Sequence, residues 1–295
     1  MKVLNFGSLN YDYVYRVEHA VKPGETIDSL GMNTFLGGKG LNQSISLARA
    51  GVPVYHAGMI GEDGALFLEA CNKNNVDANL IKMIPGKSGH AIIQLDKNAQ
   101  NCILLYGGSN RKITEAYVDE VLTHFSAGDI LLMQNEINMP EYLIERAYEK
   151  GMRIALNPSP FDKQLLACDL QKIAIFLLNE IEGEQITGEQ EPDKILEKMA
   201  ETYPEAEIVL TLGGEGAVYR KGAFSHRQPA FQVDAVDTTA AGDTFTGYFI
   251  AALLKGMPIP KAMELCAKAS AITVSRMGAT DSIPTMEEVE RMGAF

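Results

Sequence analysis

The stretch from residue 114 to residue 212 alternates regularly between amphipathic segments and short segments that are apolar at nearly every position. The amphipathic segments predict helices and the short apolar segments predict strands. Strands without polar alternation are typical of a parallel sheet that is covered by helices on both faces. The sequence therefore predicts an α/β fold, a three-layer αβα sandwich around a mainly parallel sheet, with helices over 115–125, 140–150, 162–168 and 192–202 and strands over 129–134, 153–157, 172–178 and 208–212.

The flanking parts of the chain continue this fold. Before residue 114 the apolar pattern predicts strands over 2–9 and 54–60, a helix over 41–50, and a capped helix that begins at Asp63 and ends at residue 74. Later in the chain it predicts an antiparallel hairpin over 216–220 and 226–233, then helices over 241–255, 260–276 and 285–293.

Four further segments, over 11–17, 28–36, 90–96 and 101–106, look like strands, several of them with one polar face, and a polar turn at 96–100 joins the last two. We expect them to form a small β-sheet, a lid contributed by roughly 10–38 and 88–108, on a single domain that spans 1–295. Ligands bind at the carboxyl edge of the sheet in open α/β folds. The lid is therefore expected to cover a ligand site.

The formal net charge of −12 argues against a nucleic-acid partner, because binding many phosphates requires clustered lysine and arginine. The four cysteines lie far apart in the sequence, which indicates a reducing compartment and gives no zinc site. The chain has no apolar stretch of about 18 residues, and its N-terminus lacks a signal-peptide pattern. We therefore expect a cytoplasmic protein with no membrane partner.

Two common nucleotide-binding motifs are missing from the sequence. No Gly-x-Gly-x-x-Gly follows the first strand, and Gly-x-x-x-x-Gly-Lys-Ser/Thr has no match. The sequence therefore disfavours a Rossmann dinucleotide site and a Walker-type kinase.

Residues 237–248 read Asp-Thr-Thr-Ala-Ala-Gly-Asp-Thr-Phe-Thr-Gly-Tyr, a run of small residues that leads into an apolar helix. The first turn of a helix has unpaired N–H groups, and the small Ala240, Ala241 and Gly242 would let a phosphate approach them. Asp243 beside such an anion site suits a general base that takes a proton from an attacking hydroxyl. The other interpretation of Asp243 is an N-cap, a position at which aspartate is common.

Polar residues also gather where the predicted core strands end. The carboxyl ends of parallel strands share one edge of a sheet, so we expect these residues to lie close together. They are Asn10 and Asp12 after the first strand, Glu136 after 129–134, Asn179 and Glu182 after 172–178, Thr211, Gly213 and Gly216 at 208–216, and Asp243.

Two motifs, Gly-Gly-Lys-Gly-Leu-Asn-Gln at 37–43 and the run at 237–245, resemble those of the PfkB, or ribokinase-like, carbohydrate kinases. Supporting matches at 7–12, 133–136, 157–158, 179–182 and 211–216 extend the resemblance over essentially the whole chain. The resemblance implies the ribokinase-like fold and an ATP-dependent kinase that phosphorylates the primary hydroxyl of a small sugar. The expected substrate is D-ribose and the expected product is ribose 5-phosphate.

The resemblance also implies a role for each matching residue. Asp243 is the catalytic base, and the N–H groups of Ala240, Ala241 and Gly242 form an anion hole. The remaining roles are the substrate sugar for Asn10, Asp12, Gly38, Asn42 and Glu136, Mg²⁺ and the ATP phosphates for Asn179 and Glu182, and the nucleotide for Thr211, Gly213 and Gly216. A monovalent cation, expected to be K⁺, is assigned to Asp237, Thr239, Thr273, Arg276, Gly278 and Ser282, mostly through backbone carbonyls. Lys39 is also expected to bind the substrate; it could serve a substrate phosphate, but Asn10 and Asp12 favour an unphosphorylated polyol. Ordinary helix and loop polarity explains Thr273 and Ser282 equally well.

Departures from the family pattern bear on the substrate. We expect Ile92, Gln94 and Leu105 on the lid face over the sugar, with His90 where glycine is usual in the family. Tyr248 is also larger than the residue that the family carries at that position, and a repacked core would explain it. The alternatives are a PfkB kinase acting on another sugar, a nucleoside or a sugar phosphate, and a non-catalytic sugar-binding protein on the same scaffold. The exposed edges of the lid predict a homodimer through it.

Overall fold

The computed structural model describes residues 1–97 and 100–293. Within these ranges the larger sheet has nine strands in the order β13-β12-β11-β10-β9-β8-β1-β4-β5, and only the pairs β11–β12 and β12–β13 are antiparallel. The strands are β1 (Val3–Phe6), β4 (Val54–Ile60), β5 (Asp77–Met83), β8 (Ile130–Gln134), β9 (Arg153–Asn157), β10 (Ile173–Asn179), β11 (Glu207–Thr211), β12 (Ala217–Lys221) and β13 (Phe224–Gln228). The predicted mainly parallel sheet and terminal hairpin are confirmed.

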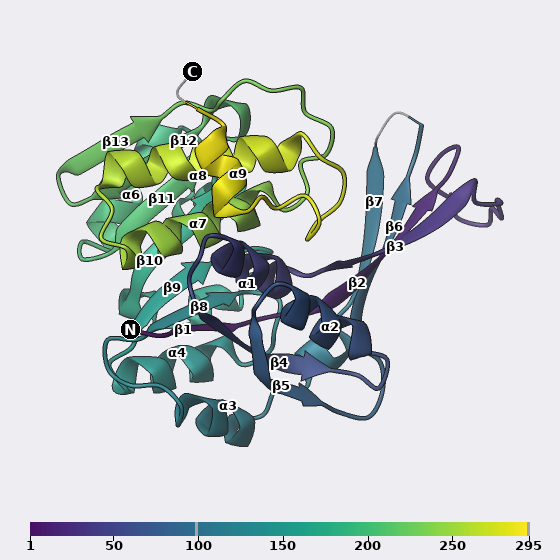
Figure 1. The fold of residues 1–295 in the computed structure, drawn as a ribbon, viewed down its shortest axis with the longest axis horizontal. Helices are drawn as coiled ribbons and strands as arrows, with labels where there is room; N and C mark the ends of the chain where they lie inside the picture. The colour runs from purple at the N-terminus through teal and green to yellow at the C-terminus, as the bar shows by residue number, and fades with distance from the viewer. Residues whose placement is uncertain (98–99, 294–295) are drawn as a thin grey trace.

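Helices cover both faces of this sheet (Figure 1). One face carries α1 (Lys39–Arg49), α2 (Ala65–Lys73), α7 (Ala241–Leu254), α8 (Ile259–Val274) and α9 (Met286–Arg291), and the other carries α3 (Glu115–Leu122), α4 (Pro140–Glu149), α5 (Glu180–Thr187) and α6 (Pro192–Thr202). Successive strand residues point to opposite faces, so Val3 packs with the first group and Leu4 with the second. The result is the predicted three-layer αβα sandwich.

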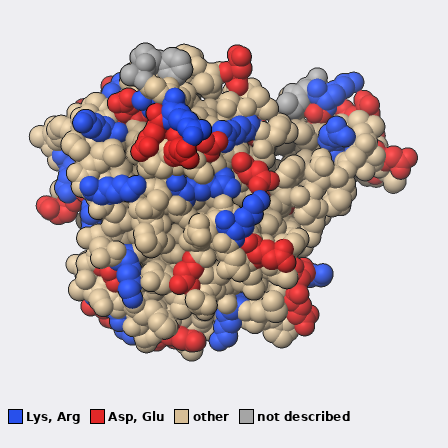
Figure 2. Space-filling view, in the orientation of Figure 1, with Lys and Arg blue, Asp and Glu red and all other residues tan. Residues whose placement is uncertain are grey.

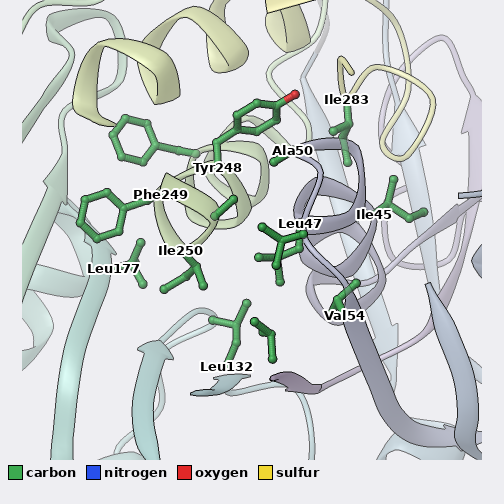
Figure 3. Packing of buried hydrophobic residues seen from close by; sticks show 14 of the residues in the cluster. Ile45, Leu47, Ala50, Val54, Leu132, Leu177, Tyr248, Phe249, Ile250 and Ile283 are labelled. Atoms are coloured by element: carbon green, nitrogen blue, oxygen red, sulfur yellow. The ribbon is translucent and has the colours of Figure 1, made fainter. Parts of the chain in front are cut away.

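Helix α7 lies within the core of the first face, and its residues from Asp243 to Ala252 are all buried. In Figure 3, Phe249 and Ile250 of α7 lie above Leu132 and Leu177 of the sheet, with Leu47 of the neighbouring α1 beside them. A helix that is apolar on all sides is stable only where other elements surround it. This packing fixes the position of the first turn of α7.

The smaller sheet projects from the side of the sandwich (Figure 1). Its strands are β2 (Asn10–Arg16), β3 (Gly31–Gly37), β6 (Gly89–Leu95) and β7 (Asn101–Tyr106), in the order β3-β2-β6-β7. Strands β2 and β6 pair in parallel and the other two pairs are antiparallel. A small sheet in addition to the main one agrees with the predicted fold class, and two positions of the predicted turn, 98–99, lie outside the described residues.

Several local predictions were wrong. The segment predicted as a helix over 162–168 contains only a 3-10 turn, η2 (Leu165–Ala167), and Asp63 does not cap α2, whose N-cap is Gly64. The Asp63 carboxylate instead accepts hydrogen bonds from the N–H and hydroxyl of Ser88. Strand β5 and helix α5 were not predicted, and the remaining 3-10 turns are η1 (Gly108–Arg111), η3 (Leu170–Lys172) and η4 (Gly213–Glu215).

The face of the molecule seen in Figure 2 carries positive and negative side chains side by side. None of the helices formed by residues 1–97 and 100–293 combines the length and the hydrophobicity needed to span a lipid bilayer.

Candidate active site

A cavity of about 850 Å³ lies between the carboxyl edge of the larger sheet and one face of the smaller sheet. The predicted residues that line it are Asn10, Asp12, Gly38, Lys39, Asn42, Glu136, Asn179, Glu182, Thr211, Asp237, Thr239, Ala240, Ala241, Gly242, Asp243 and Gly278. Gly213, Gly216, Thr273, Arg276 and Ser282 do not belong to this lining. The fold therefore brings most of the predicted residues to one place.

The first turn of α7 forms one wall of the cavity. Ala240 is its N-cap, with φ of 61°, so Asp243 is the third helical residue and the N-cap interpretation of Asp243 is wrong. The N–H of Thr244 donates to the Ala240 carbonyl at 2.8 Å, and the N–H of Ala241 donates to the Thr238 carbonyl at 3.3 Å. The N–H groups of Gly242 and Asp243 belong to the turn in which a helix supplies no acceptor. They are free to bind an anion.

Asp243 is 6% exposed, and its carboxylate receives two hydrogen bonds from α1. Asn42 Nδ2 donates to Oδ2 at 2.9 Å, and Gln43 Nε2 donates to Oδ1 at 2.8 Å. Helix α1 begins directly after Gly38, whose φ of 91° suits glycine. Two amide donors thus hold a carboxylate beside the anion-binding turn.

Asn10, at the start of β2, is held by a residue that the sequence analysis missed. Asn110 in η1 donates from Nδ2 to Asn10 Oδ1 at 2.8 Å and to the Leu9 carbonyl at 3.2 Å, and its Oδ1 accepts the Leu9 N–H at 3.1 Å. This clamp directs the Asn10 carbonyl oxygen away from other partners and leaves its amide NH₂ as the donor toward the cavity. No motif in the sequence marks Asn110, because its role depends on a contact across 100 residues.

Carboxyl groups crowd the same end of the cavity. Burial, followed by the charges of Glu136 and Asp243, raises the pKa of the Asp12 carboxyl to about 7. Glu136 is fixed by two donors on its Oε2, the Ser8 hydroxyl and the Lys39 backbone N–H, the latter at 2.9 Å. Both groups line the cavity, so they present several acceptors to a polyhydroxylated ligand.

Lys39 provides a positive charge among these carboxylates. Burial alone would lower the pKa of its ammonium, but the charges of Asp243, Glu136 and Glu182 outweigh burial and raise that pKa. The ammonium therefore remains charged inside the cavity, where it favours an anionic ligand.

Asn179 and Glu182 lie where β10 passes into α5, and both line the cavity. They form a capping box: Asn179 Oδ1 accepts the Glu182 N–H at 3.0 Å, and Glu182 Oε2 accepts the Asn179 N–H at 3.0 Å. Asn179 Nδ2 also donates to Glu182 Oε1 at 3.2 Å. The Glu182 carboxylate is thereby held at the cavity wall, where it can accept hydrogen bonds from metal-bound water.

The glycines after β11 have different environments. A side chain on Gly216 would place its Cβ 2.0 Å from the Gln228 carbonyl oxygen, so the contact with β13 already explains this glycine. A Cβ on Gly213 would meet no atom within 4 Å. Thr211 lines the cavity and its hydroxyl donates to the Leu178 carbonyl at 3.4 Å.

The predicted cation residues fall into two groups. Asp237 ties two loops together, because its carboxylate accepts the Thr239 N–H at 2.9 Å and the Gly278 N–H at 3.0 Å. The side chains of the other three have partners elsewhere: the Thr273 hydroxyl donates to the Ala269 carbonyl and is hydrogen-bonded to the Thr244 hydroxyl, Arg276 pairs with Glu288, and the Ser282 hydroxyl donates to the Ala279 carbonyl. In the part of the chain that the structure describes, no cluster of three or more His, Cys, Asp or Glu side chains is arranged to hold a metal ion.

The face of the smaller sheet that covers the cavity differs from the prediction. Ala91, Ile93 and Leu95 line the cavity, together with Leu105 and Ile103, which pair with Ala91 and Ile93. Successive strand residues point to opposite faces, so the predicted His90, Ile92 and Gln94 lie on the outer face. Only Leu105 was assigned correctly, and Gln94 instead accepts the Val21 N–H at 2.9 Å.

Tyr248 is a core residue. Its side chain is fully buried, and its hydroxyl donates to the Pro284 carbonyl at 3.0 Å (Figure 3). The larger side chain is thus explained by packing between α7 and the C-terminal segment, and it does not line the cavity.

Comparisons with known proteins agree with this geometry. Ribokinase from Haemophilus influenzae is 35% identical over 292 residues, covering 96% of this chain and 95% of that protein. The crystal structure of Cryptococcus neoformans ribokinase in complex with ADP matches with a TM-score of 0.87 and 29% identity, covering 99% of both chains. Arabidopsis thaliana ribokinase complexed with ribose and ATP matches with a TM-score of 0.86 and 28% identity, covering 99% of this chain and 98% of that one.

A family model described as pfkB family carbohydrate kinase matches residues 1–286, nearly the whole of the chain. It includes both sequence motifs that meet at the cavity, the one that begins α1 and the one that begins α7. The chain belongs to the pfkB family of carbohydrate kinases.

Proposed function

We propose that this ATP-dependent carbohydrate kinase phosphorylates D-ribose at its primary hydroxyl to give ribose 5-phosphate. The observation that carries the proposal is the Asp243 carboxylate, held by two amides beside the unpaired N–H groups of the α7 first turn. Ribose is supported as the substrate by the ribokinases that match over nearly the full chain, one of which was solved with ribose and ATP.

The sugar binds at the carboxyl-rich end of the cavity. Asn10, Asp12, Asn42 and Glu136 line this end with amide and carboxyl groups, and the backbone of Gly38 lies beside them. A hydroxyl both donates and accepts, so mixed amide and carboxylate partners suit a polyol. The apolar Ala91, Ile93 and Leu105 of the smaller sheet close over the sugar and exclude water from the reaction.

Transfer proceeds by in-line displacement. Asp243 accepts the proton of the sugar hydroxyl as its oxygen bonds to the γ-phosphorus of ATP, and the bond from that phosphorus to the β-phosphate oxygen breaks to release ADP. The unpaired N–H groups of Gly242 and Asp243 in the first turn of α7 and the Lys39 ammonium stabilise the charge on the transferring phosphoryl group.

The nucleotide lies along the ends of β10 and β11. Thr211 lines this part of the cavity, and the open surroundings of Gly213 leave space for a ligand, with Gly216 shaping the turn behind it. Asn179 and Glu182 would hold Mg²⁺ through water, where it would neutralise phosphate charge.

A potassium ion is supported by the chemistry of the loops that Asp237 joins. A carboxylate and backbone carbonyls are hard oxygen ligands. The proposed ligands, mostly through their backbone carbonyls, are Asp237, Thr239, Thr273, Arg276, Gly278 and Ser282. The ion would fix the loop that leads into the anion-binding turn.

A homodimer through the outer face of the smaller sheet is supported by exposed apolar side chains there. Met32, Leu104 and Tyr106 are 47%, 68% and 53% exposed, and β7 is an edge strand. The cytoplasmic location stays a prediction.

The test is ADP release from Mg-ATP with ribose, deoxyribose, fructose, adenosine and fructose 6-phosphate, in K⁺ or Na⁺. We expect the highest kcat/KM with ribose, activation by K⁺, and a loss of about 10²–10⁴-fold in Asp243→Asn. Another best acceptor would overturn ribose and leave the kinase in place. Sugar binding without ADP release in the wild type would instead indicate a non-catalytic sugar-binding protein.

A further inference from the structure

Asp243 is connected to a buried chain of side-chain amides that the reaction scheme does not use. Gln43 donates from Nε2 to Asp243 Oδ1 at 2.8 Å, and its Oε1 accepts Gln134 Nε2 at 2.6 Å. Gln134 Nε2 also donates to Asn5 Oδ1 at 2.9 Å. Gln43, Gln134 and Asn5 are each 0–1% exposed, so water does not compete for these contacts.

Both ends of this chain are fixed by backbone carbonyls, which can only accept. Asn5 Nδ2 donates to the Gly40 carbonyl at 2.7 Å, so its Oδ1 must face Gln134. On the other side, Asn157 Nδ2 donates to the Leu177 carbonyl at 2.8 Å, so its Oδ1 accepts Gln43 Nε2 at 3.1 Å. A rotated amide anywhere in the chain would place two oxygens or two NH₂ groups against each other.

The orientation of the Gln43 amide is therefore determined from both sides. Its carbonyl oxygen meets the NH₂ of Gln134, and its NH₂ meets Asn157 and Asp243. Gln43 can present only a donor to Asp243, and a donor stabilises the charged carboxylate and fixes its rotation. The second oxygen, Oδ2, faces Asn42, which lines the cavity.

We propose that Gln43 is a positioning residue for Asp243, and that Gln134, Asn5 and Asn157 set its orientation. The amide chain keeps the carboxylate aimed at the sugar hydroxyl within a cavity that also holds Asp12 and Glu136. This inference rests on the proposed role of Asp243 as the base, and three of the residues that it adds, Gln43, Gln134 and Asn5, do not line the cavity.

The test compares Gln43→Leu and Gln43→Glu with Ser46→Ala. Ser46 lies on α1, is fully buried, and donates to the Thr244 carbonyl at 2.9 Å, so its loss also removes a buried hydrogen bond between α1 and α7 without touching Asp243. We expect Gln43→Leu to lower kcat about 10- to 100-fold with KM for both substrates changed less than about threefold, and Gln43→Glu to lower kcat further, because it places an oxygen against the carboxylate.

The pH dependence separates positioning from stability. Without the donor the charged carboxylate is less favoured, so the acidic limb of the kcat profile of Gln43→Leu should move about one pH unit upward. Ser46→Ala should be less thermally stable than the wild type, but the acidic limb of its kcat profile should lie at the wild-type pH. Gln134→Met, which frees the Gln43 amide to rotate, should give a smaller loss of kcat and a smaller movement in the same direction.

An unmoved acidic limb in Gln43→Leu, with kcat equal to that of Ser46→Ala, would overturn the proposal. Thermal unfolding of each variant shows whether it folds. If Gln43→Leu does not fold, the kcat values and acidic limbs of Gln43→Glu and Gln134→Met test the proposal instead. Wild-type and Asp243→Asn activities are measured first. An inactive wild type would contradict the proposed function, whereas an active wild type with unaffected Gln43 variants would contradict only the positioning role.

Discussion

Asp12 lies in the cavity beside Glu136 and Asp243, and its pKa of about 7 in the folded chain is well above the ordinary value of 3.8. Between these two values the folded state binds a proton that the unfolded state has released. The free energy of unfolding therefore falls as the pH rises from about 4 to about 7, and the loss is complete above 7, where the buried carboxyl is ionised as well. The residue that suits the sugar thus destabilises the empty protein at alkaline pH.

We predict that Asp12→Asn is more stable than the wild type at pH 8, by about 1–3 °C in Tm, and that this advantage is smaller at pH 5.5. At pH 5.5 the carboxyl is neutral in the folded wild type but ionised in the unfolded chain, so only part of the advantage remains. Thermal unfolding of both proteins at the two pH values measures the difference. Asp28→Asn, an exposed position between β2 and β3, is the control, and equal curves for Asp12→Asn and wild type at pH 8 would contradict the prediction.

At this scale the sequence indicated the cavity residues but not the side chains that orient them. Asp243 and Asn42 belong to recognisable motifs and do meet. Asn110 and Gln134 were assigned no chemical role from the sequence, because their hydrogen-bond partners lie far away in the sequence and come close only in the folded chain. The lid face was misassigned by one residue, because alternation gives two faces and only the register to β7 decides which covers the cavity.

Helices α1 and α7 are the elements on which the geometry of Asp243 depends, because α1 supplies both amide donors and α7 carries the carboxylate. Their contact is close at Gly247. A Cβ there would lie 2.3 Å from Ser46 Oγ and 2.8 Å from the Leu47 backbone nitrogen. The helices can approach to this distance only with glycine at the contact.

We expect Gly247→Ala to lower the free energy of unfolding by about 1–3 kcal/mol, because the helices must separate to accept the methyl group. The same displacement moves the amides of α1 away from Asp243, so kcat should fall as well. Urea unfolding and steady-state kinetics measure the two effects. Gly214→Ala, where an added Cβ meets no atom within 4 Å, controls for stability. An unchanged unfolding midpoint in Gly247→Ala would show that the contact is not tight.

Elements were predictable where their period was clear, as for β8 to β11 and for α7 and α8. Helix α5 was missed because Asn179 and Glu182 were interpreted only as a ligand motif, whereas they also form the capping box at the start of this helix. The segment 162–168 contains too few residues to separate an α-helix from a 3-10 turn by periodicity. The sequence pattern was therefore ambiguous for short segments and for residues that have both a structural and a ligand-binding interpretation.

For the whole molecule, the outer face of the smaller sheet is the surface proposed to join two copies. Leu104 on this face pairs with Ile92 on β6 and is 68% exposed. Apolar side chains on an edge strand are unfavourable in water unless a partner covers them.

We predict that Leu104→Glu shifts the chain from dimer to monomer, because pairing would bury a charge without a partner. Sedimentation equilibrium across a range of concentrations should show a dissociation constant raised at least about tenfold. Leu66→Glu, at an exposed leucine of α2, should leave the constant unchanged. A monomeric wild type, or a Leu104→Glu protein that remains dimeric, would contradict the proposed interface.

The hydrogen bond from Asn42 to Asp243 joins residues 201 positions apart. During synthesis on the ribosome, the donors of α1 emerge long before the carboxylate that they hold, and the anion-binding turn emerges with that carboxylate. A nascent or prematurely terminated chain that stops before α7 therefore lacks the proposed base and the proposed phosphate-binding turn. On this proposal such fragments have no kinase activity, and activity arises only in a late step of translation.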